Sequence, residues 1–207
     1  MAAPLVGQSV RVPNAKLRVL SSAEAKNAVR KLDLKQLPPR AKVTIKPTQE
    51  FALDASGTKE LIVVPTYFEF DPPVGSSDRR DQCGVFFLEP SGKSQYVSVM
   101  GRDDDYVSVC EGALATGTMT DPGPRPRLIL IFNGSLPNGN DYPNPFVMYW
   151  SPATESYQVD VGISKWLIDQ NNAGTVSQIR HLLAHQTYKG NARHSLKNSW
   201  VRHSSRT

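Results

Sequence analysis

The sequence predicts an α+β fold, made mainly of antiparallel β-sheet with one N-terminal helix and one or two C-terminal helices. Two observations support this prediction. Short apolar segments with strand-like alternation are separated by many of the 16 prolines and 14 glycines of the 207-residue chain, as expected of strands joined by turns. Helical periodicity, in contrast, is confined to segments nearer the two ends. The apolar share of 39% suffices for one hydrophobic core.

The N-terminal helix is predicted to begin just after residue 20. Ser21 and Glu24 have the spacing of a capping box, in which each residue satisfies a backbone amide of the other. The pair Pro38–Pro39 prevents the helix from continuing. We expect the helix to cover one face of a sheet. Its apolar stripe consists of Ala25, Ala28, Val29 and Leu32.

Beyond the proline pair the pattern changes to the period of two that is typical of a half-buried strand. Apolar and polar residues alternate around Val43 and Ile45, and again around Phe51. A long strand is then predicted over residues 60–70. We expect a bulge or bend at Pro65, because proline cannot donate a hydrogen bond to a neighbouring strand.

The two cysteines are predicted to form a disulfide at the ends of a three-stranded meander. Cys83 and Cys110 would lie on its first and third strands, where a bridge would clamp the unit. A disulfide is favoured over a metal site because neither a second nearby cysteine nor a histidine accompanies either residue. The strands are expected over 83–89, 94–100 and 106–110, with a turn at 90–93.

The second half of the chain contains the strongest candidate for a central strand. Residues 128–132 are five consecutive apolar residues, which indicates that both faces of the strand are covered. The polar segments 116–126 and 133–145 are predicted to be loops. A hairpin of strands 146–150 and 156–159 is expected to follow.

Two C-terminal helices are predicted, over 161–169 and 175–185, with Thr175 as a possible N-cap. No linker separates two apolar halves, so we expect a single α+β domain over residues 1–186. Residues 187–207 are polar and basic, and are predicted to form a flexible tail.

The search for catalytic, metal-binding and cofactor-binding motifs identifies no such residue. His181 and His185 are spaced as on one helix face, but the glutamate of the zinc-protease motif is missing between them. Nucleophile elbows, phosphate-binding loops and dinucleotide fingerprints are also missing. The sequence therefore predicts neither a catalytic residue nor a cofactor. An enzyme whose site assembles from scattered residues remains an alternative.

The positive charge is concentrated at the two ends of the chain. Residues 1–47 carry ten Lys or Arg and two Asp or Glu, and residues 187–207 carry five Lys or Arg and no acid. The remainder is acidic. Electrostatic binding of nucleic acid or an anionic surface through these ends is a second alternative. Because the excess is modest, a solvated surface is the expected reading, and nucleic acid is not the expected partner.

The residues predicted to bind a protein partner lie in one turn and one loop. The turn is acidic and ends in an aromatic residue, as expected at the rim of a protein interface. The loop follows the predicted central strand, and long loops on rigid sheets often carry function. The candidates are Arg102, Asp103, Asp104, Asp105 and Tyr106 in the turn, with Asn138, Asp141 and Tyr142 in the loop.

A periplasmic or otherwise exported location is expected for two reasons. The disulfide favours an oxidising compartment. The start Met1–Leu5 is similar to a mature end left after removal of a signal peptide. A membrane span is not expected, because no apolar run approaches the roughly 20 residues that a membrane-spanning helix needs.

One region resembles a known class of proteins. Phe146–Trp150, a turn, Tyr157–Asp160 and the helix-like Ile163–Leu167 form a strand–turn–strand–helix ending. This ending resembles that of periplasmic immunity proteins paired with type VI secretion toxins, and of periplasmic hydrolase inhibitors. The resemblance covers the final third of the chain and leaves both basic ends unaccounted for. It implies a non-enzymatic protein that occludes the active site of a secreted toxin or hydrolase, and transfers no functional residue.

Overall fold

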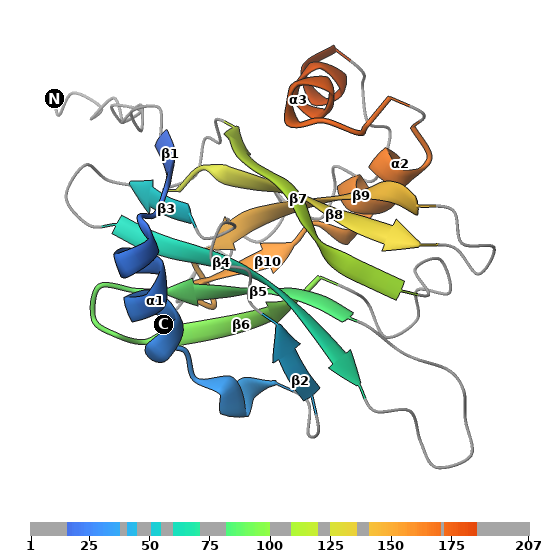
Figure 1. Ribbon diagram of the computed structural model, residues 1–207. Helices are drawn as coiled ribbons and strands as arrows, with labels where there is room; N and C mark the ends of the chain where they lie inside the picture. Colours follow the sequence, from blue (N-terminus) through green and yellow to red (C-terminus); the bar gives the residue numbers. More distant parts are fainter. Residues whose placement is uncertain are drawn as a thin grey trace, which may run out of the picture.

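The computed structural model consists of two antiparallel β-sheets that pack face to face, with helices on both outer faces (Figure 1). The α+β prediction is therefore confirmed. The structure describes residues 16–37, 41–44, 51–54, 60–70, 82–99, 109–119, 125–135, 141–170 and 172–185.

The first sheet, called sheet A, is centred on the long strand β4, and the second, called sheet B, on β8. Sheet A has the order β1-β3-β4-β5-β6, and β2 pairs with the far half of β4. It consists of β1 (Lys16–Val19), β2 (Ala41–Thr44), β3 (Phe51–Asp54), β4 (Glu60–Phe70), β5 (Gln82–Leu88) and β6 (Ser94–Ser98). Sheet B has the order β10-β9-β8-β7. It consists of β7 (Val109–Met119), β8 (Arg127–Ser135), β9 (Asp141–Ser151) and β10 (Ser156–Val159).

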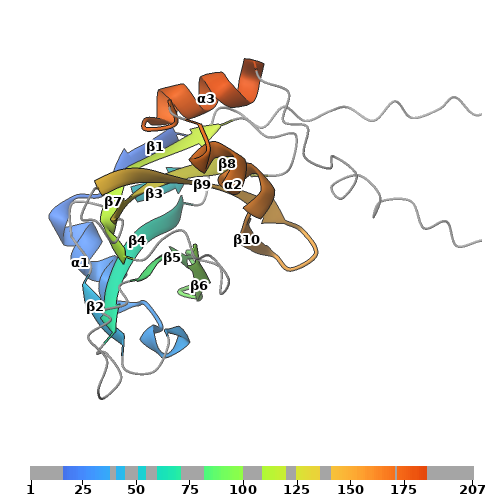
Figure 2. The same ribbon diagram turned by 90° about the vertical axis from the view of Figure 1, so that its right-hand side faces the viewer.

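The helices and sheets form four layers with three apolar interfaces. Helix α1 covers the outer face of sheet A, while α2 and α3 cover the outer face of sheet B (Figure 2). The central interface lies between the two sheets. The helices span Ser22–Arg30 (α1), Val161–Ile168 (α2) and Val176–His185 (α3), and a short 3₁₀ helix spans Leu34–Gln36 (η1).

Strand β8 shows why an unbroken apolar run marks a central strand. Leu128, Leu130 and Phe132 point into the interface between the sheets, whereas Ile129 and Ile131 pack under the helices. All five are fully buried. Because side chains alternate between the faces of a strand, a strand covered on both faces needs apolar residues at every position.

Pro65 introduces no bulge into the pairing of β4 with β5; a bulge is one of the two irregularities that the sequence predicts there. The pairing of β4 with β5 runs through Pro65 without a register shift. On its other side β4 pairs with β3 over 60–63 and with β2 over 67–70. The proline thus occupies the gap between two short partner strands, where the missing amide hydrogen costs no ladder hydrogen bond.

The predicted meander is wrong in its third strand, although the disulfide is present. Strand β7 pairs with β8 in sheet B and not with β6 in sheet A. The Cys83–Cys110 disulfide therefore links β5 of one sheet to β7 of the other, with 5.8 Å between the Cα atoms. Both cysteines are buried in the central interface. The bridge joins the two sheets instead of clamping one hairpin unit.

Two segments predicted to be loops are partly strand. Within 116–126, residues up to Met119 belong to β7, and within 133–145, β8 continues to Ser135 and β9 begins at Asp141. Prolines 143 and 145 are accommodated because β10 pairs with β9 only from Met148 onward, which leaves that side of β9 unpaired. Pairing across the sheet thus outweighs the low strand propensity of these residues.

Helices occur at the three predicted places, but α1 ends at Arg30, before Leu32 of the predicted apolar stripe, and the sequence did not indicate η1. Ser21 and Glu24 form the expected capping box, and Thr175 accepts a hydrogen bond from the Gln178 amide. The predicted tail 187–207 lies outside the described residues, so the division into domain and tail stays a prediction. In the part of the chain that the structure describes, no helix combines the length and the apolar character needed to cross a bilayer.

Candidate partner-binding cleft

A cleft of about 280 Å³ lies between the sheets, at the end of the sandwich where β5 leads into β6 and β9 leads into β10. Its volume falls slightly below the range of roughly 300–1,000 Å³ that small-molecule sites occupy. This size suits one or two large side chains of another protein. The cleft is lined by Gln36, Leu61, Phe87, Glu89, Lys93, Ser94, Gln95, Trp150, Thr154, Glu155 and Ser156.

Two tight turns form opposite walls of the cleft. In the β5–β6 turn, Glu89 and Lys93 are joined by a backbone hydrogen bond of 2.9 Å, and Gly92 adopts a φ of 86° that favours glycine. In the β9–β10 turn, Glu155 has a φ of 48° although it carries a side chain. The hydroxyls of Thr154 and Ser156 are 2.7 Å apart, which fixes this second turn.

Gln36 of η1 blocks the outer edge of β6 beside the cleft. Its side-chain Nε2 donates to the carbonyl oxygen of Ser94 at 2.9 Å, and its Oε1 accepts from the amide of Tyr96 at 2.8 Å. One amide side chain thus replaces the pairing that another strand would supply. This arrangement protects an edge that would otherwise pair with a second chain.

Stacked aromatic rings hold the two sheets together beneath the cleft. Phe87 of β5 stacks on Tyr157 of β10 with ring centroids 4.8 Å apart, and Trp150 of β9 meets the same tyrosine edge-on at 5.4 Å. The Tyr157 hydroxyl donates to the carbonyl oxygen of Pro126 at 3.0 Å. The guanidinium of Arg125 lies 3.7 Å from the Trp150 ring centroid. These contacts order Trp150, which remains partly exposed at the cleft.

The rim of the cleft carries charges of both signs. Glu89 and Glu155 contribute carboxylates and Lys93 an ammonium group. An apolar floor with a polar, charged rim is the anatomy of a protein-binding surface. Within the described ranges, no three His, Cys, Asp or Glu side chains gather closely enough to hold a metal ion.

The sequence-predicted partner-binding residues do not line this cleft. Asp141 and Tyr142 begin β9, and Tyr142, the nearer of the two, is eight residues from Trp150 and hence about 27 Å away along the strand. Asp141 is exposed, whereas Tyr142 lies over Gly134, and burial raises the pKa of its phenol. The other predicted residues lie outside the described part of the chain: Arg102, Asp103, Asp104, Asp105, Tyr106 and Asn138.

The cleft residues were missed because they come from different sheets. The sequence located both turns, at 90–93 and around 151–155, but not their proximity. That proximity follows from the packing of edge strand β10 beside edge strand β6. The sequence does show that Trp150 directly precedes a predicted turn. Because tryptophan is enriched in protein-binding sites, this position is the one sequence signal that could have identified it as a candidate.

The two helical histidines lie on α3, away from the cleft-lining residues. His181 and His185 are both exposed, with ring centroids 4.5 Å apart. Comparison with known proteins finds no family model, no curated protein and no solved structure that matches this chain.

Proposed function

We propose that this protein is an exported, non-enzymatic binding protein of the immunity or inhibitor type, which contacts a secreted toxin or hydrolase through the cleft and its two turns. The observation that carries this proposal is the position of Trp150. Its ring is fixed by Tyr157 and Arg125, and part of it remains open to a partner between two charged turns.

Ordered aromatic side chains make effective anchors for protein recognition. Tryptophan is enriched among the residues that dominate binding energies, and charged residues are typical of the surrounding rim. Here the rim residues Glu89, Lys93 and Glu155 come from two rigid turns. A partner would therefore meet groups of both signs at set positions, which favours specificity for one partner.

The framework supports this role because little of it must become ordered on binding. The disulfide ties the two sheets together at one end, and the Phe87–Tyr157 stack ties them at the other. Preorganised surfaces lose less conformational entropy when they bind. The buried disulfide also supports the exported location, since such bonds persist in oxidising compartments.

The proposal is tested by affinity capture from a periplasmic or secreted extract, with the partner identified by mass spectrometry. The test variants are Trp150→Ala and Glu155→Arg. The matched control is Tyr142→Ala, which truncates a partly exposed aromatic residue of the same strand at the opposite end. We expect one stoichiometric protein with the wild type and with the control, and at least a tenfold loss of affinity for each cleft variant.

Equal capture by the Trp150→Ala variant and the wild type would exclude the cleft as the contact surface. Loss of the partner with Tyr142→Ala alone would move the interface to the disulfide end, where two of the sequence-predicted residues lie. A captured hydrolase or toxin is then assayed for inhibition, which distinguishes an inhibitor from a protein that merely binds.

A further inference from the structure

The solvent-facing side of α1 carries basic residues that no described carboxylate neutralises. Lys26 and Arg30 are one turn apart on the face opposite the buried Ala25 and Ala28, and both are exposed. Lys31 follows at the end of the helix and is also exposed. No ion pair involving these three side chains occurs among the described residues. We call Lys26 and Arg30 the basic face of α1; Lys31, the C-cap residue, lies about 100° further around the axis.

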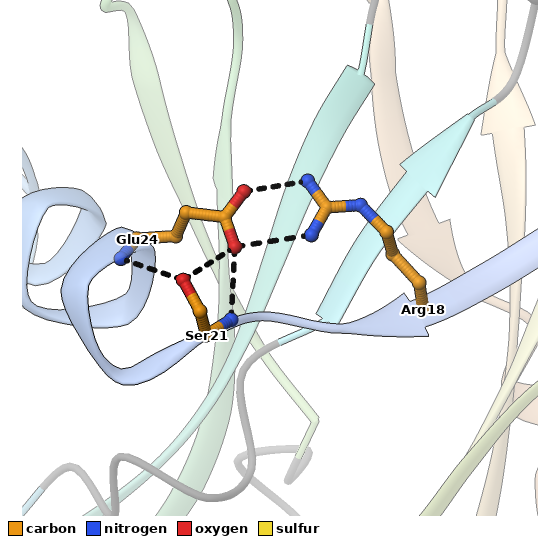
Figure 3. A network of polar contacts seen from close by, with 3 residues as sticks. All are labelled: Arg18, Ser21 and Glu24. Atoms are coloured by element: carbon orange, nitrogen blue, oxygen red, sulfur yellow. Dashed lines mark hydrogen bonds and ion pairs between the residues drawn. The ribbon is translucent and has the colours of Figure 1, made fainter.

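Glu24, the one acidic residue of α1, already forms hydrogen bonds with residues other than Lys26 and Arg30. Glu24 accepts two hydrogen bonds from the guanidinium of Arg18, at 2.8 and 3.1 Å, and bonds both the amide and the hydroxyl of Ser21 (Figure 3). Arg18 and Ser21 together lower the pKa of Glu24 from 4.5 to about 2. The carboxylate is thus charged at neutral pH but compensated by Arg18.

The next acidic residue along the chain, Asp33, is also held by hydrogen bonds to nearby residues. Asp33 caps η1, where its carboxylate accepts hydrogen bonds from the Lys35 amide and from the Gln36 side chain. In the segment from Arg18 to Leu37, Glu24 is thus paired with Arg18 and Asp33 with η1, so neither carboxylate is paired with Lys26 or Arg30. The net charge of the segment does not show this arrangement, because a sum of charges does not say which cation each carboxylate is paired with.

We propose that the basic face of α1 binds the phosphate backbone of duplex nucleic acid without sequence preference. Lys26 and Arg30 are about 6 Å apart along the helix axis and lie on the same side of α1, so both can contact phosphates of one backbone. Lysine and arginine on a helix are the usual partners of backbone phosphates. The activity is independent of the cleft, which opens at another part of the molecule.

Two other polyanionic partners fit this surface less well. A membrane-bound amphipathic helix inserts its apolar face into the bilayer, but the apolar face of α1 is already buried against sheet A. A single strand is usually held by stacking of its bases on aromatic rings. The exposed residues of α1 include no aromatic side chain. Backbone contact with a duplex requires neither feature.

The test measures the binding of the full chain to a fluorescent 20-base-pair DNA duplex by anisotropy, at NaCl concentrations between 25 and 150 mM, with an RNA duplex of equal length as a second probe. Each cation that contacts a phosphate contributes about 0.9 to the slope of log K against log salt concentration. We expect Lys26→Gln/Arg30→Gln to lower the slope by about 2 and the affinity at 0.1 M salt by tenfold to a hundredfold.

Two further variants separate this effect from a loss of folding. Lys165→Gln on α2 removes one charge from the opposite outer layer and is expected to leave the slope unchanged. Glu24→Gln removes the negative charge of α1 while leaving Lys26 and Arg30 in place, and is expected to tighten binding. A variant that merely unfolds the helix would not bind more tightly.

An unchanged slope for the double variant would overturn the proposal, since binding would then come from other basic segments. Failure of the wild type to bind either duplex at 25 mM salt would do the same. So would binding to phosphatidylserine vesicles in the absence of duplex binding. Comparable affinity for DNA and RNA duplexes is the expected result, because both present the same phosphodiester groups.

Discussion

At one end of the sandwich a disulfide joins β5 of sheet A to β7 of sheet B, whereas at the other end β5 meets β10 through stacked aromatic rings. We call these the disulfide end and the cleft end. At the disulfide end the strands of sheet B also align closely, with Cys110, Gly134 and Tyr142 side by side on three neighbouring strands. At the cleft end the two turns diverge and leave a space between the sheets.

The comparison shows how one sandwich can combine stability with recognition. A covalent bond at one end limits the separation of the sheets, so the other end can expose an aromatic side chain and charged turns without the whole structure opening. Functional surfaces often tolerate locally unfavourable geometry when the surrounding structure fixes it. Glu155, the one described non-glycine residue with positive φ, lies at the cleft end.

The largest effect is expected from breaking the disulfide end. Cys83→Ser/Cys110→Ser should lower the free energy of unfolding by about 3.5 kcal/mol, since the bond closes a loop over a sequence separation of 27 residues. Urea denaturation of the wild type and the double variant measures the difference. A loss below about 1 kcal/mol would show that the aromatic contacts alone hold the sheets together.

A smaller loss is expected at the cleft end from Tyr157→Phe. This change keeps the ring stack with Phe87 but removes the buried hydrogen bond to the Pro126 carbonyl oxygen. The unpaired buried carbonyl should cost about 1–2 kcal/mol in urea denaturation. If the loss instead equalled that of the disulfide variant, the two ends would contribute equally and the contrast between them would fail.

The variant Gln36→Ala tests whether the Gln36 side chain protects the outer edge of β6 at the cleft end. The variant loses both hydrogen bonds to β6, and we expect a cost of about 1 kcal/mol because Gln36 is exposed. Hydrogen exchange should accelerate at the Tyr96 amide, which donates to Gln36, and not at the Phe86 amide within β5. Unchanged exchange at Tyr96 would mean that the edge is protected by another group.

The smallest effect is the dependence of stability on pH that comes from Glu24. This residue belongs to neither the disulfide end nor the cleft end. Because the pKa of Glu24 is lowered from 4.5 to about 2, its contribution to stability is present above pH 4.5 and is lost as the pH falls toward 2. Glu24→Gln should therefore be less stable than the wild type at pH 6 and equally stable near pH 2. A difference that persisted at pH 2 would assign the stabilisation to something other than the ionised carboxylate.

Much of the fold could be predicted from local pattern. The capping box at Ser21 and Glu24, the buried strand 128–132 and the β9–β10 hairpin each rest on neighbouring residues, and each is confirmed. The errors concern pairing over longer distances. Strand β7 pairs with β8 and not with the predicted partner at 94–100, and polar stretches of β8 and β9 that the sequence predicts as loops are strands, because their partners, not their own residues, make them so.

The sequence by itself determined the fold class, the start of the first helix, the two C-terminal helices, the turns at 90–93 and around 151–155, and the pairing of the two cysteines. These properties follow from periodicity and capping, which act over a few residues, and from the presence of just two thiols. The tertiary structure alone decided that the disulfide joins two sheets, that two distant turns enclose a cleft around Trp150, and that Glu24 of α1 pairs with Arg18 of β1. Each of these depends on how separate elements pack, and the packing of one surface on another is not encoded in any single segment.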